Sequence, residues 1–449
     1  MNPNHAQPPE SSYSRRDIVK SGAALALPLV VAGCAASAPG AKTPFAPRVT
    51  KQLKIGVVGC GGRGTGAAVQ ALRADPNTVL WAMADVFGDR MEGSLQGVAT
   101  EMGESAAARV QVPPERRYLG FDSHRRVTDD PEIDVVLLTS YPHFRPAQLA
   151  AAVAAGKHVF AEKPLAVDGP GLRSVLASAE LAKQKRLALL VGFCWRYHDG
   201  MRASFDALHD GAIGDVLSVH TTYHTGTLSR RPRRPEWSEM EFQMRNWWHF
   251  TWISGDHIVE QAVHSIDRLS WAMRDELPLR VNCLGGRAAR SGPEHGDVYD
   301  HFAAIYEYAD GRRGFHTCTQ IDGTPSDNTD YVTGSDGRAA INGWNPESFV
   351  MLDRKGREEW RYKGENRDMY QNEHDQLFAS IRGGYPIHDG VRGAHSTLMA
   401  IMARNAAYTG QTVTWEQALA SQEVLGPASY ALGDVPLREV PIPGKTPLA

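Results

Sequence analysis

The chain has 449 residues, which is enough for two domains of ordinary size. Hydrophobic residues make up 42% and charged residues 22%, so the composition is that of a globular protein and excludes a disordered, collagen-like or coiled-coil chain. The formal net charge is -3 at pH 7, and without a basic field we expect no nucleic-acid partner. The five cysteines form no CxxC pair, which argues against a zinc-ribbon or thioredoxin-like protein.

The first 33 residues are predicted to be an export signal rather than part of the fold. Arg15 and Arg16 form a twin-arginine pair, and an uncharged, mostly apolar run follows over 21–33. That run is shorter than the roughly 20 residues that a permanent membrane-spanning helix needs. The four residues that end at Cys34 match a lipoprotein cleavage box, with Cys34 as the lipidated residue.

Export by this route defines the expected location and partners. We predict that the twin-arginine translocase is a partner and that the mature protein is periplasmic. The membrane would then be contacted only through a lipid on Cys34. The alternative is a plain N-terminal segment with a chance arginine pair.

A glycine-rich loop follows the first predicted strand. The apolar run 53–58 is typical of a buried strand, residues 59–64 match G-x-G-x-x-G, and small residues over 65–72 favour a helix. In a dinucleotide-binding fold the first glycine allows a tight turn, the second lets the backbone approach the pyrophosphate, and the third lets helix and strand pack closely. The positive end of the helix dipole then faces the phosphates. The residues predicted to bind the cofactor here are Gly59, Gly61, Gly62, Arg63 and Gly64.

The second predicted strand, 79–84, ends at an acidic residue, Asp85. A carboxylate at that strand end can accept hydrogen bonds from both ribose hydroxyls, and it would repel a 2′-phosphate. We therefore predict that Asp85 contacts the cofactor and that NAD is favoured over NADP. The alternative is that Asp85 is an ordinary N-cap of the next helix.

Strands and helices continue to alternate, as is typical of a parallel sheet. Residues 134–138 and 158–161 are predicted to be short buried strands, with a helix over 146–155 between them. We therefore expect a tether over 34–52 and an α/β Rossmann domain over 53–173.

Four motifs, in this order along the chain, resemble those of the Gfo/Idh/MocA oxidoreductases, the glucose–fructose oxidoreductase and inositol dehydrogenase group. The resemblance covers about residues 53–440. It implies that the Rossmann domain is followed, over 174–449, by a substrate-binding and oligomerisation domain. That domain would hold an open, mostly antiparallel sheet with helices on one face, and the protein would be a homo-oligomer. The motifs are GCGGRG at 59–64, EKP at 162–164, GFCWRYH at 192–198 and GDHIVEQAVHSID at 255–267.

The last of these motifs is predicted to be one helix over 256–268. At helical spacing, His257, Glu260, His264 and Asp267 share one face, and apolar residues cover the opposite side. A solvated polar face and a zinc site are the alternatives. We predict no metal, because the H-x-x-E-x-x-x-H spacing is not the HExxH of metalloproteases.

The resemblance assigns roles to three of these positions. Lys163, Glu260 and His264 match the family's catalytic residues, and Glu162 and Lys163 are expected beside the cofactor. His264 would be the general base that removes the hydroxyl proton while hydride leaves for NAD. Glu260 would bind the sugar and tune His264, although the family commonly has Asp there. Lys163 also follows a predicted parallel strand, where α/β proteins bind ligands.

The second half alternates like an antiparallel sheet, with helices near its end. A long irregular segment, 229–248, combines five arginines with three tryptophans, whose faces can stack on sugars. We predict substrate contacts from Trp247 and the adjoining His249, and also from Arg196 and Tyr197; an ordinary surface loop is the alternative. The predicted strands are 216–224, 300–308, 316–320 and 331–333, and the predicted helices are 371–382 and 393–409.

Export restricts the mechanism that the resemblance implies. Outside the inner membrane there is no useful pool of free NAD, whereas the twin-arginine route carries folded proteins with their cofactor loaded. We therefore predict tightly bound NAD and an oxidoreductase that acts on a CH–OH group of a sugar, glycoside or polyol. One alternative is a redox-neutral, NAD-dependent glycosidase that works by transient oxidation and elimination. Another is a non-catalytic sugar-binding lipoprotein.

Overall fold

The computed structural model describes residues 49–345 and 348–448. The predicted signal, Cys34 and most of the predicted tether lie outside these residues. Within the described part of the chain, no helix has both the length and the apolarity to cross a membrane.

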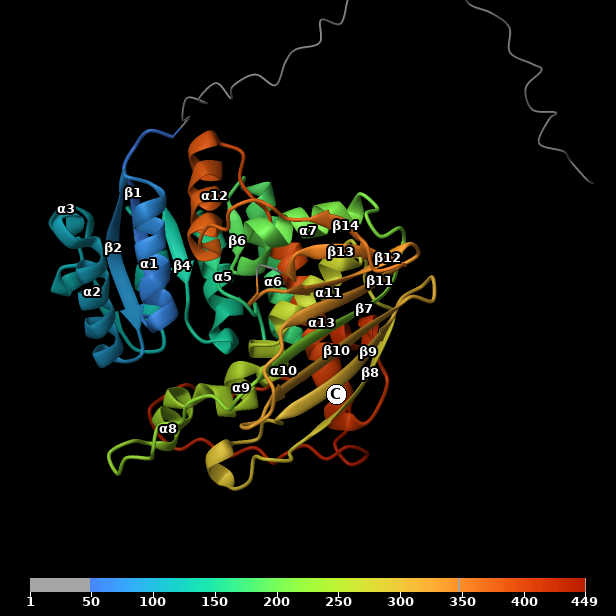
Figure 1. Cartoon of the computed structure of the whole chain (residues 1–449). Helices are drawn as coiled ribbons and strands as arrows, with labels where there is room; N and C mark the ends of the chain where they lie inside the picture. Colours follow the sequence, from blue (N-terminus) through green and yellow to red (C-terminus); the bar gives the residue numbers. More distant parts are fainter. Residues whose placement is uncertain (1–48, 346–347, 449) are drawn as a thin grey trace, which may run out of the picture. The chain divides into compact units, whose positions relative to one another are not determined.

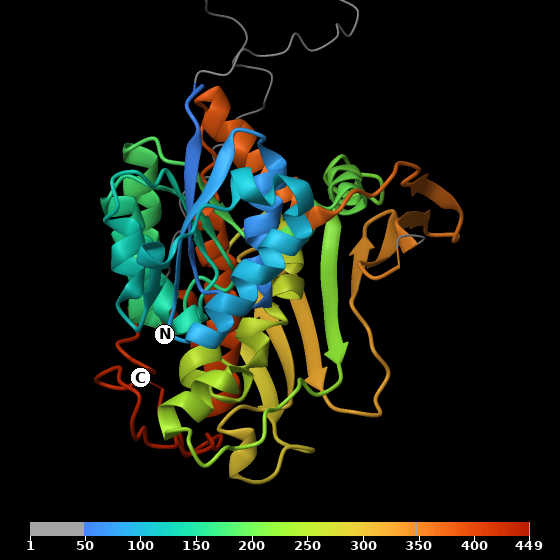
Figure 2. The same cartoon turned by 90° about the vertical axis from the view of Figure 1, so that its left-hand side faces the viewer.

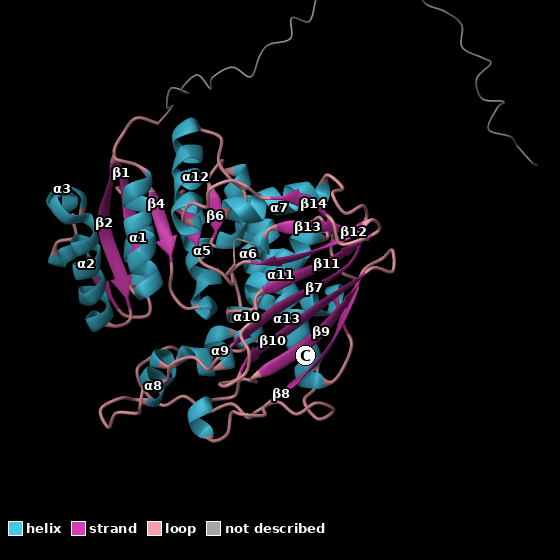
Figure 3. Cartoon of the chain, in the orientation of Figure 1, coloured by secondary structure: helices cyan, strands magenta, loops and turns pink. Residues whose placement is uncertain are grey.

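The first sheet has six strands, all parallel, in the order β3-β2-β1-β4-β5-β6. Its central strands are runs of Val, Leu, Ile and Ala that are buried on both sides, as helices on both faces of a parallel sheet require. Figure 2 shows these strands between two groups of helices, and Figure 3 colours the strands magenta and the helices cyan. The strands are β1 (Leu53–Val58), β2 (Thr78–Asp85), β3 (Arg117–Leu119), β4 (Val135–Leu138), β5 (His158–Ala161) and β6 (Leu189–Val191). The longer helices of this half are α1 (Gly62–Ala74), α2 (Gly88–Met102), α4 (Ser123–Thr128), α5 (Arg145–Ala154) and α6 (Gly169–Gln184).

The predicted Rossmann architecture is confirmed, and each of the four strands predicted in this half matches an observed one to within one residue. The sheet nevertheless extends beyond residue 173, where the sequence analysis ended the domain. Helix α6 continues to Gln184, and β6 is hydrogen-bonded to β5 as the sixth strand. The GFCWRYH motif therefore begins directly after the first sheet.

The second sheet has nine strands in the order β14-β13-β12-β11-β7-β10-β9-β8-β15. Only the β7–β10 pair is parallel, so the predicted, mostly antiparallel sheet is confirmed. Helices α11 and α13 contact strands of this sheet, and burial alternates along β9 and β12, as one covered and one open face require. Its strands are β7 (Val216–Thr225), β8 (Arg280–Gly286), β9 (His301–Glu307), β10 (Arg313–Gln320), β11 (Thr329–Gly334), β12 (Gly337–Asn342), β13 (Val350–Asp353), β14 (Glu358–Arg361) and β15 (Val413–Thr414).

The second half also contributes a helix to the first. Helix α12, orange in Figures 1 and 2, stands beside the blue α1 and packs against it. The carboxyl ends of β1, β2 and β4 point toward the level of α8 and α9 (Figure 1). The helices of this half are α7 (Asp199–His209), α8 (Glu239–Arg245), α9 (Thr251–Ser254), α10 (His257–Glu260), α11 (Val263–Ala272), α12 (Met369–Gly383), α13 (Gly390–Thr409) and α14 (Trp415–Ala420).

The prediction of one helix over 256–268 is wrong, because the segment forms two helices, α10 and α11. Between them the carbonyl oxygen of His257 accepts from the backbone N–H groups of both Gln261 and Ala262, at 2.9 Å each. This wide turn adds a residue to the repeat and changes the phase of the helix by about 100°. The four polar residues of the motif therefore do not share one face: Glu260 and His264 line the cavity described below, and His257 and Asp267 do not.

Candidate active site

A cavity of about 710 Å³ lies at the carboxyl edge of the first sheet. It is lined by the glycine-rich loop, the end of β2, the β4–α5 connection, the EKP motif and parts of the segment from Tyr223 to His264. Both halves of the chain therefore contribute to the cavity. Its position at the carboxyl ends of the parallel strands is where open α/β sheets bind their ligands.

The glycine-rich loop is shaped to receive a dinucleotide. Gly59 has φ = +97°, and a Cβ there would overlap the backbone of Ser140. A Cβ on Gly64 would overlap the carbonyl oxygen of Gly59, so this glycine lets α1 approach β1 closely, although Gly64 itself does not line the cavity. Cβ atoms on Gly61 and Gly62 would meet nothing within 4 Å. These two glycines leave space on the cavity side, and α1 starts there without a side-chain cap, so its first N–H groups can receive a pyrophosphate.

Asp85 is held rigidly at the end of β2, where it lines the cavity. Its Oδ2 accepts from the backbone N–H of Cys60 at 2.6 Å, and its Oδ1 accepts from that of Phe87 at 2.8 Å. Burial raises the pKa of this carboxyl, and the backbone hydrogen bonds oppose that rise. The residue is not the N-cap of α2, a position that Phe87 takes. A carboxylate fixed in this place retains lone pairs for ribose hydroxyls, which fits NAD.

Arg63 and Glu162 line the cavity but are engaged with each other. Arg63 Nε lies 2.5 Å from Glu162 Oε1, and Arg63 Nη2 lies 2.9 Å from Oε1 of Glu373 in α12. Burial opposes the charge of Arg63, but the two carboxylates raise its pKa; burial also raises the pKa of Glu373. Arg63 thus joins the glycine-rich loop to the EKP motif and to α12. Because Arg63 and Glu162 already bind each other, a direct contact of either side chain with the cofactor stays a prediction.

The structure brings the three predicted catalytic residues into the same cavity. Lys163 Nζ donates to the backbone carbonyl of Glu260 at 2.5 Å and lies 3.2 Å from its Oε1. His264 follows one turn later, with Phe193 packed edge-on against its ring. Burial lowers the pKa of His264 well below its usual range, and the Lys163 and Arg268 cations lower it further. The imidazole is therefore neutral near pH 7 and able to accept a proton.

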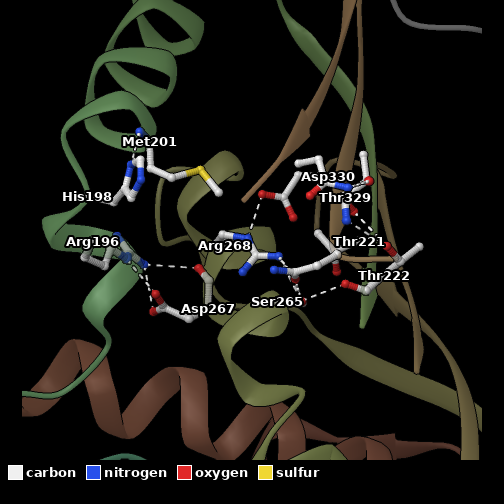
Figure 4. A network of polar contacts seen from close by, with 12 residues as sticks. Arg196, His198, Met201, Thr221, Thr222, Ser265, Asp267, Arg268, Thr329 and Asp330 are labelled. Carbon is white, nitrogen blue, oxygen red and sulfur yellow. Dashed lines mark hydrogen bonds and ion pairs between the residues drawn. The ribbon is translucent and has the colours of Figure 1, made fainter. Parts of the chain in front are cut away.

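Two of the predicted substrate contacts, Arg196 and Tyr197, lie away from the cavity. Arg196 is bonded to Asp267 at 2.9 Å and to Asp275, in the buried network of Figure 4. The Tyr197 hydroxyl donates to Asp389 at 2.6 Å. Neither side chain lines the cavity, because each is committed to a carboxylate that supports the helices behind it. Asp267 thus turns into this network rather than joining His264.

The predicted sugar contacts divide in the same way. Trp247 lines the cavity, with Trp248 packed on it at a ring-centroid distance of 4.0 Å. His249 is fully buried and does not line the cavity, and burial lowers its pKa to about 3. His257 is also buried, with its ring 5.1 Å from that of Phe302. Neither histidine is placed to meet a substrate in this cavity.

Several cavity residues were not anticipated from the sequence. Arg145 is fully buried and donates to the carbonyl oxygens of Pro164 and Ser140, so it ties the EKP motif to the end of β4. Burial lowers its pKa to about 10. An arginine in the first turn of a helix that follows a parallel strand was a usable signal for it. The remaining unanticipated cavity residues include Tyr141, Tyr223, Gln261 and Tyr370, which give no such local signal, whereas Arg231 belongs to the predicted segment of arginines and tryptophans.

Comparisons with known proteins agree with this geometry. Residues 53–193 match a family model described as "Oxidoreductase family, NAD-binding Rossmann fold", and residues 201–340 match the "GFO/IDH/MocA C-terminal domain". The chain is 27% identical over 250 residues to trans-1,2-dihydrobenzene-1,2-diol dehydrogenase of Mus musculus, which is 55% of this chain and 66% of that protein. It is 29% identical over 228 residues to inositol 2-dehydrogenase of Pseudomonas fluorescens strain Pf-5, which is 50% of this chain and 60% of that protein. The chain therefore spans less than two thirds of the length of either curated relative.

Solved structures share the fold. Levoglucosan dehydrogenase in complex with NADH and levoglucosan aligns with a TM-score of 0.62 at 20% identity, over 81% of this chain and 98% of that one. The apo scyllo-inositol dehydrogenase of Lactobacillus casei aligns with a TM-score of 0.61 at 19% identity, over 82% of this chain and 99% of that one.

Proposed function

Because the chain belongs to the Gfo/Idh/MocA family, we propose that it is an NAD-dependent oxidoreductase of a sugar, glycoside or polyol. The observation that carries this proposal is that one cavity contains both the proposed cofactor cradle, which is the glycine-rich loop 59–64 with Asp85, and a cluster of polar side chains. That cluster is Lys163, Glu260 and His264. A dinucleotide seated on the cradle would extend toward these three side chains. Oxidation of a CH–OH group requires a hydride acceptor and a base that both lie next to the reacting carbon.

The proposed chemistry divides between the cofactor and the chain. NAD, when bound, accepts the hydride from the substrate carbon. Neutral His264 takes the proton of the substrate hydroxyl, so the C–H and O–H bonds break and a C=O bond forms, with two electrons and two hydrogens removed from the substrate. Lys163 is held at Glu260 and can donate a hydrogen bond to the reacting oxygen. Arg145 positions Lys163 indirectly, through the carbonyl of the adjoining Pro164.

We propose further that the cofactor is tightly held. The helix α8 reaches back to the first half, where Arg245 pairs with Asp89 at 2.9 Å and 3.0 Å and with Glu241 at 2.8 Å. The Tyr141 hydroxyl donates to the carbonyl of Met244 at 2.7 Å. These contacts connect the two walls of the cavity beside its dinucleotide end and would slow cofactor release. Export of the loaded protein remains a proposal that rests on the arginine pair near the N-terminus.

An assay on the purified full chain tests the activity. The protein is incubated with a panel of aryl glycosides and free sugars, and aglycone release and the absorbance of NADH are followed together. We expect NADH to rise by one turnover and then stop, and an added keto acceptor to reoxidise it so that oxidation of the sugar continues. Steady aglycone release without accumulating NADH would instead assign a redox-neutral glycosidase. Absence of both signals across the panel would contradict the proposed activity.

A further inference from the structure

The segment 229–248 presents one arginine to the cavity that differs from its neighbours. Four of its five arginines lie within 4 Å of a carboxylate. In the described part of the chain, no carboxylate lies within ion-pair distance of the fifth, Arg231, which lines the cavity. The paired arginines and their partners are Arg230 with Glu294, Arg233 with Glu239, Arg234 with Glu236, and Arg245 with Asp89.

The backbone of Arg231 is fixed by a buried side chain. Asn246 is fully buried; its Oδ1 accepts from the N–H of Arg231 at 2.7 Å, and its Nδ2 donates to the carbonyl of Arg231 at 3.2 Å. The same Nδ2 also bonds the carbonyl of Phe242 in α8. A buried amide that pairs with both backbone groups of one exposed residue holds that residue in place. This loop therefore positions Arg231 at the cavity wall.

The other cations that line the cavity already have partners within the protein. Arg63 is shared by Glu162 and Glu373, and Lys163 is beside Glu260. Arg145 is committed to two backbone carbonyls, and Arg90 donates to the Tyr141 hydroxyl. Among the described residues, Arg231 is thus the cavity arginine whose guanidinium has no protein partner, and it is available to an anionic ligand. A single planar guanidinium matches the single charge and two oxygens of a carboxylate.

The cavity that Arg231 lines also carries aromatic and polar side chains of the kind that bind sugars. Trp247 and Trp248 follow Asn246 directly in the chain and line the same cavity. Tyr223 and Gln261 line the same cavity and bond each other next to Glu260. We infer that Arg231 determines specificity by binding a carboxylate on the substrate, so that the substrate class is a uronic acid or its glycoside. This inference rests on the proposed function and deepens it.

The test compares matched substrates on the holoenzyme. The ratio of kcat/KM for methyl glucuronide to kcat/KM for its neutral methyl ester is measured with a keto acceptor present. We expect a ratio of about 10 to 100 for the unchanged protein, the range for a charge-assisted pair. Arg231→Gln should lower the ratio toward one. Arg231→Lys keeps the charge but loses the paired N–H donors of the guanidinium, so it should give an intermediate value. Arg234→Gln, a change on the same loop outside the cavity, should leave the ratio unaltered.

The outcomes separate this inference from the proposed function. Turnover of the neutral ester with a ratio near one would overturn the inference and keep the oxidoreductase. A preference for glucose 6-phosphate over the glucuronide would overturn the carboxylate assignment. An equal loss of NADH affinity in Arg231→Gln would place Arg231 on the cofactor and also overturn it. If nothing is turned over, calorimetry of glucuronate binding to the holoenzyme decides: binding that Arg231→Gln abolishes supports the inference, and equal binding refutes it.

Discussion

The two ends of the cavity are built in different ways. The dinucleotide end, which consists of residues 59–64 and Asp85, comes from one β-α-β unit and is held by backbone geometry. The substrate end, with Lys163, Glu260 and His264, is assembled from both halves of the chain by side-chain contacts. Function at the first end should therefore depend on space and backbone N–H groups, and at the second on charge and proton affinity.

The largest effect is expected from the proton acceptor of the substrate end. His264→Ala should lower kcat/KM by about 10²- to 10⁴-fold, the usual contribution of a general base. The affinity for NADH, measured by fluorescence titration, should stay within about twofold, because His264 belongs to the other end. His301→Ala, a change in a histidine of β9 outside the cavity, is the control. Full turnover in His264→Ala would remove it from the mechanism.

The pH dependence of the unchanged protein tests the same group. His264 must be neutral to accept a proton, and burial followed by the Lys163 and Arg268 cations lowers its pKa. The loss of kcat/KM that belongs to His264 should thus occur well below pH 6.5 as the pH falls. In Lys163→Met one of these cations is removed, so the acid limb of the residual activity should move to higher pH. A limb that moves to lower pH would contradict this electrostatic account.

At the dinucleotide end, the next largest effect is expected from filling the cradle. Gly61→Val adds a side chain whose Cβ meets no protein atom within 4 Å, so the free energy of unfolding should change by no more than about 0.5 kcal/mol. The same side chain takes the space for the pyrophosphate, and the affinity for NAD should fall about 100-fold or more. Gly433→Val, a second glycine with open space around it, is the matched control. Unchanged NAD affinity in Gly61→Val would show that the cofactor binds elsewhere.

A smaller effect is expected from the carboxylate at the end of β2. Asp85→Asn keeps the acceptor for Phe87 but loses charge, so NAD affinity should fall about tenfold and discrimination against NADP should weaken. Parallel titrations with the two cofactors measure both changes. Asp134→Asn is the control, since Asp134 also accepts from a backbone N–H but at the opposite edge of the sheet. An unchanged ratio of the two affinities would exclude Asp85 from ribose recognition.

The same contrast explains what could be predicted from the sequence. The glycine-rich loop and Asp85 lie within one local unit whose spacing is dictated by the turn, so their positions followed from the pattern. Glu373 is 310 residues from its partner Arg63, and no local period links them. The wide turn after Glu260 was also invisible, because its residues are good helix formers. Asp267 lies three residues after His264 in α11, but its carboxylate binds Arg196, a partner 71 residues away along the chain that no local pattern reveals.

Arg196 and Tyr197 illustrate the other limit of sequence reasoning. Both follow a strand at the carboxyl edge, a position that favours ligand contacts, yet Asp267 and Asp389 from later helices bind them. Polar residues near a site serve either the ligand or the scaffold, and only their three-dimensional partners distinguish the two. In the sequence, Arg231 is one of five similar arginines. Only the structure distinguishes it, because the other four form ion pairs with carboxylates.

The smallest effect is expected where the two walls of the cavity meet. Arg245→Gln removes an ion pair to Asp89, whose carboxylate is 61% exposed, so the contact contributes only about 0.5–1 kcal/mol. Because the pair joins α8 to the dinucleotide end, that loss should appear as a two- to fivefold faster release of NADH, measured by stopped-flow fluorescence. The effect should shrink as ionic strength rises, since salt screens exposed charges. Arg73→Gln breaks a comparable exposed pair with Glu101 away from the cavity and should leave the release rate unaltered. If both variants release NADH at the original rate, the cofactor is retained by the cradle alone, and the substrate half adds nothing to its binding.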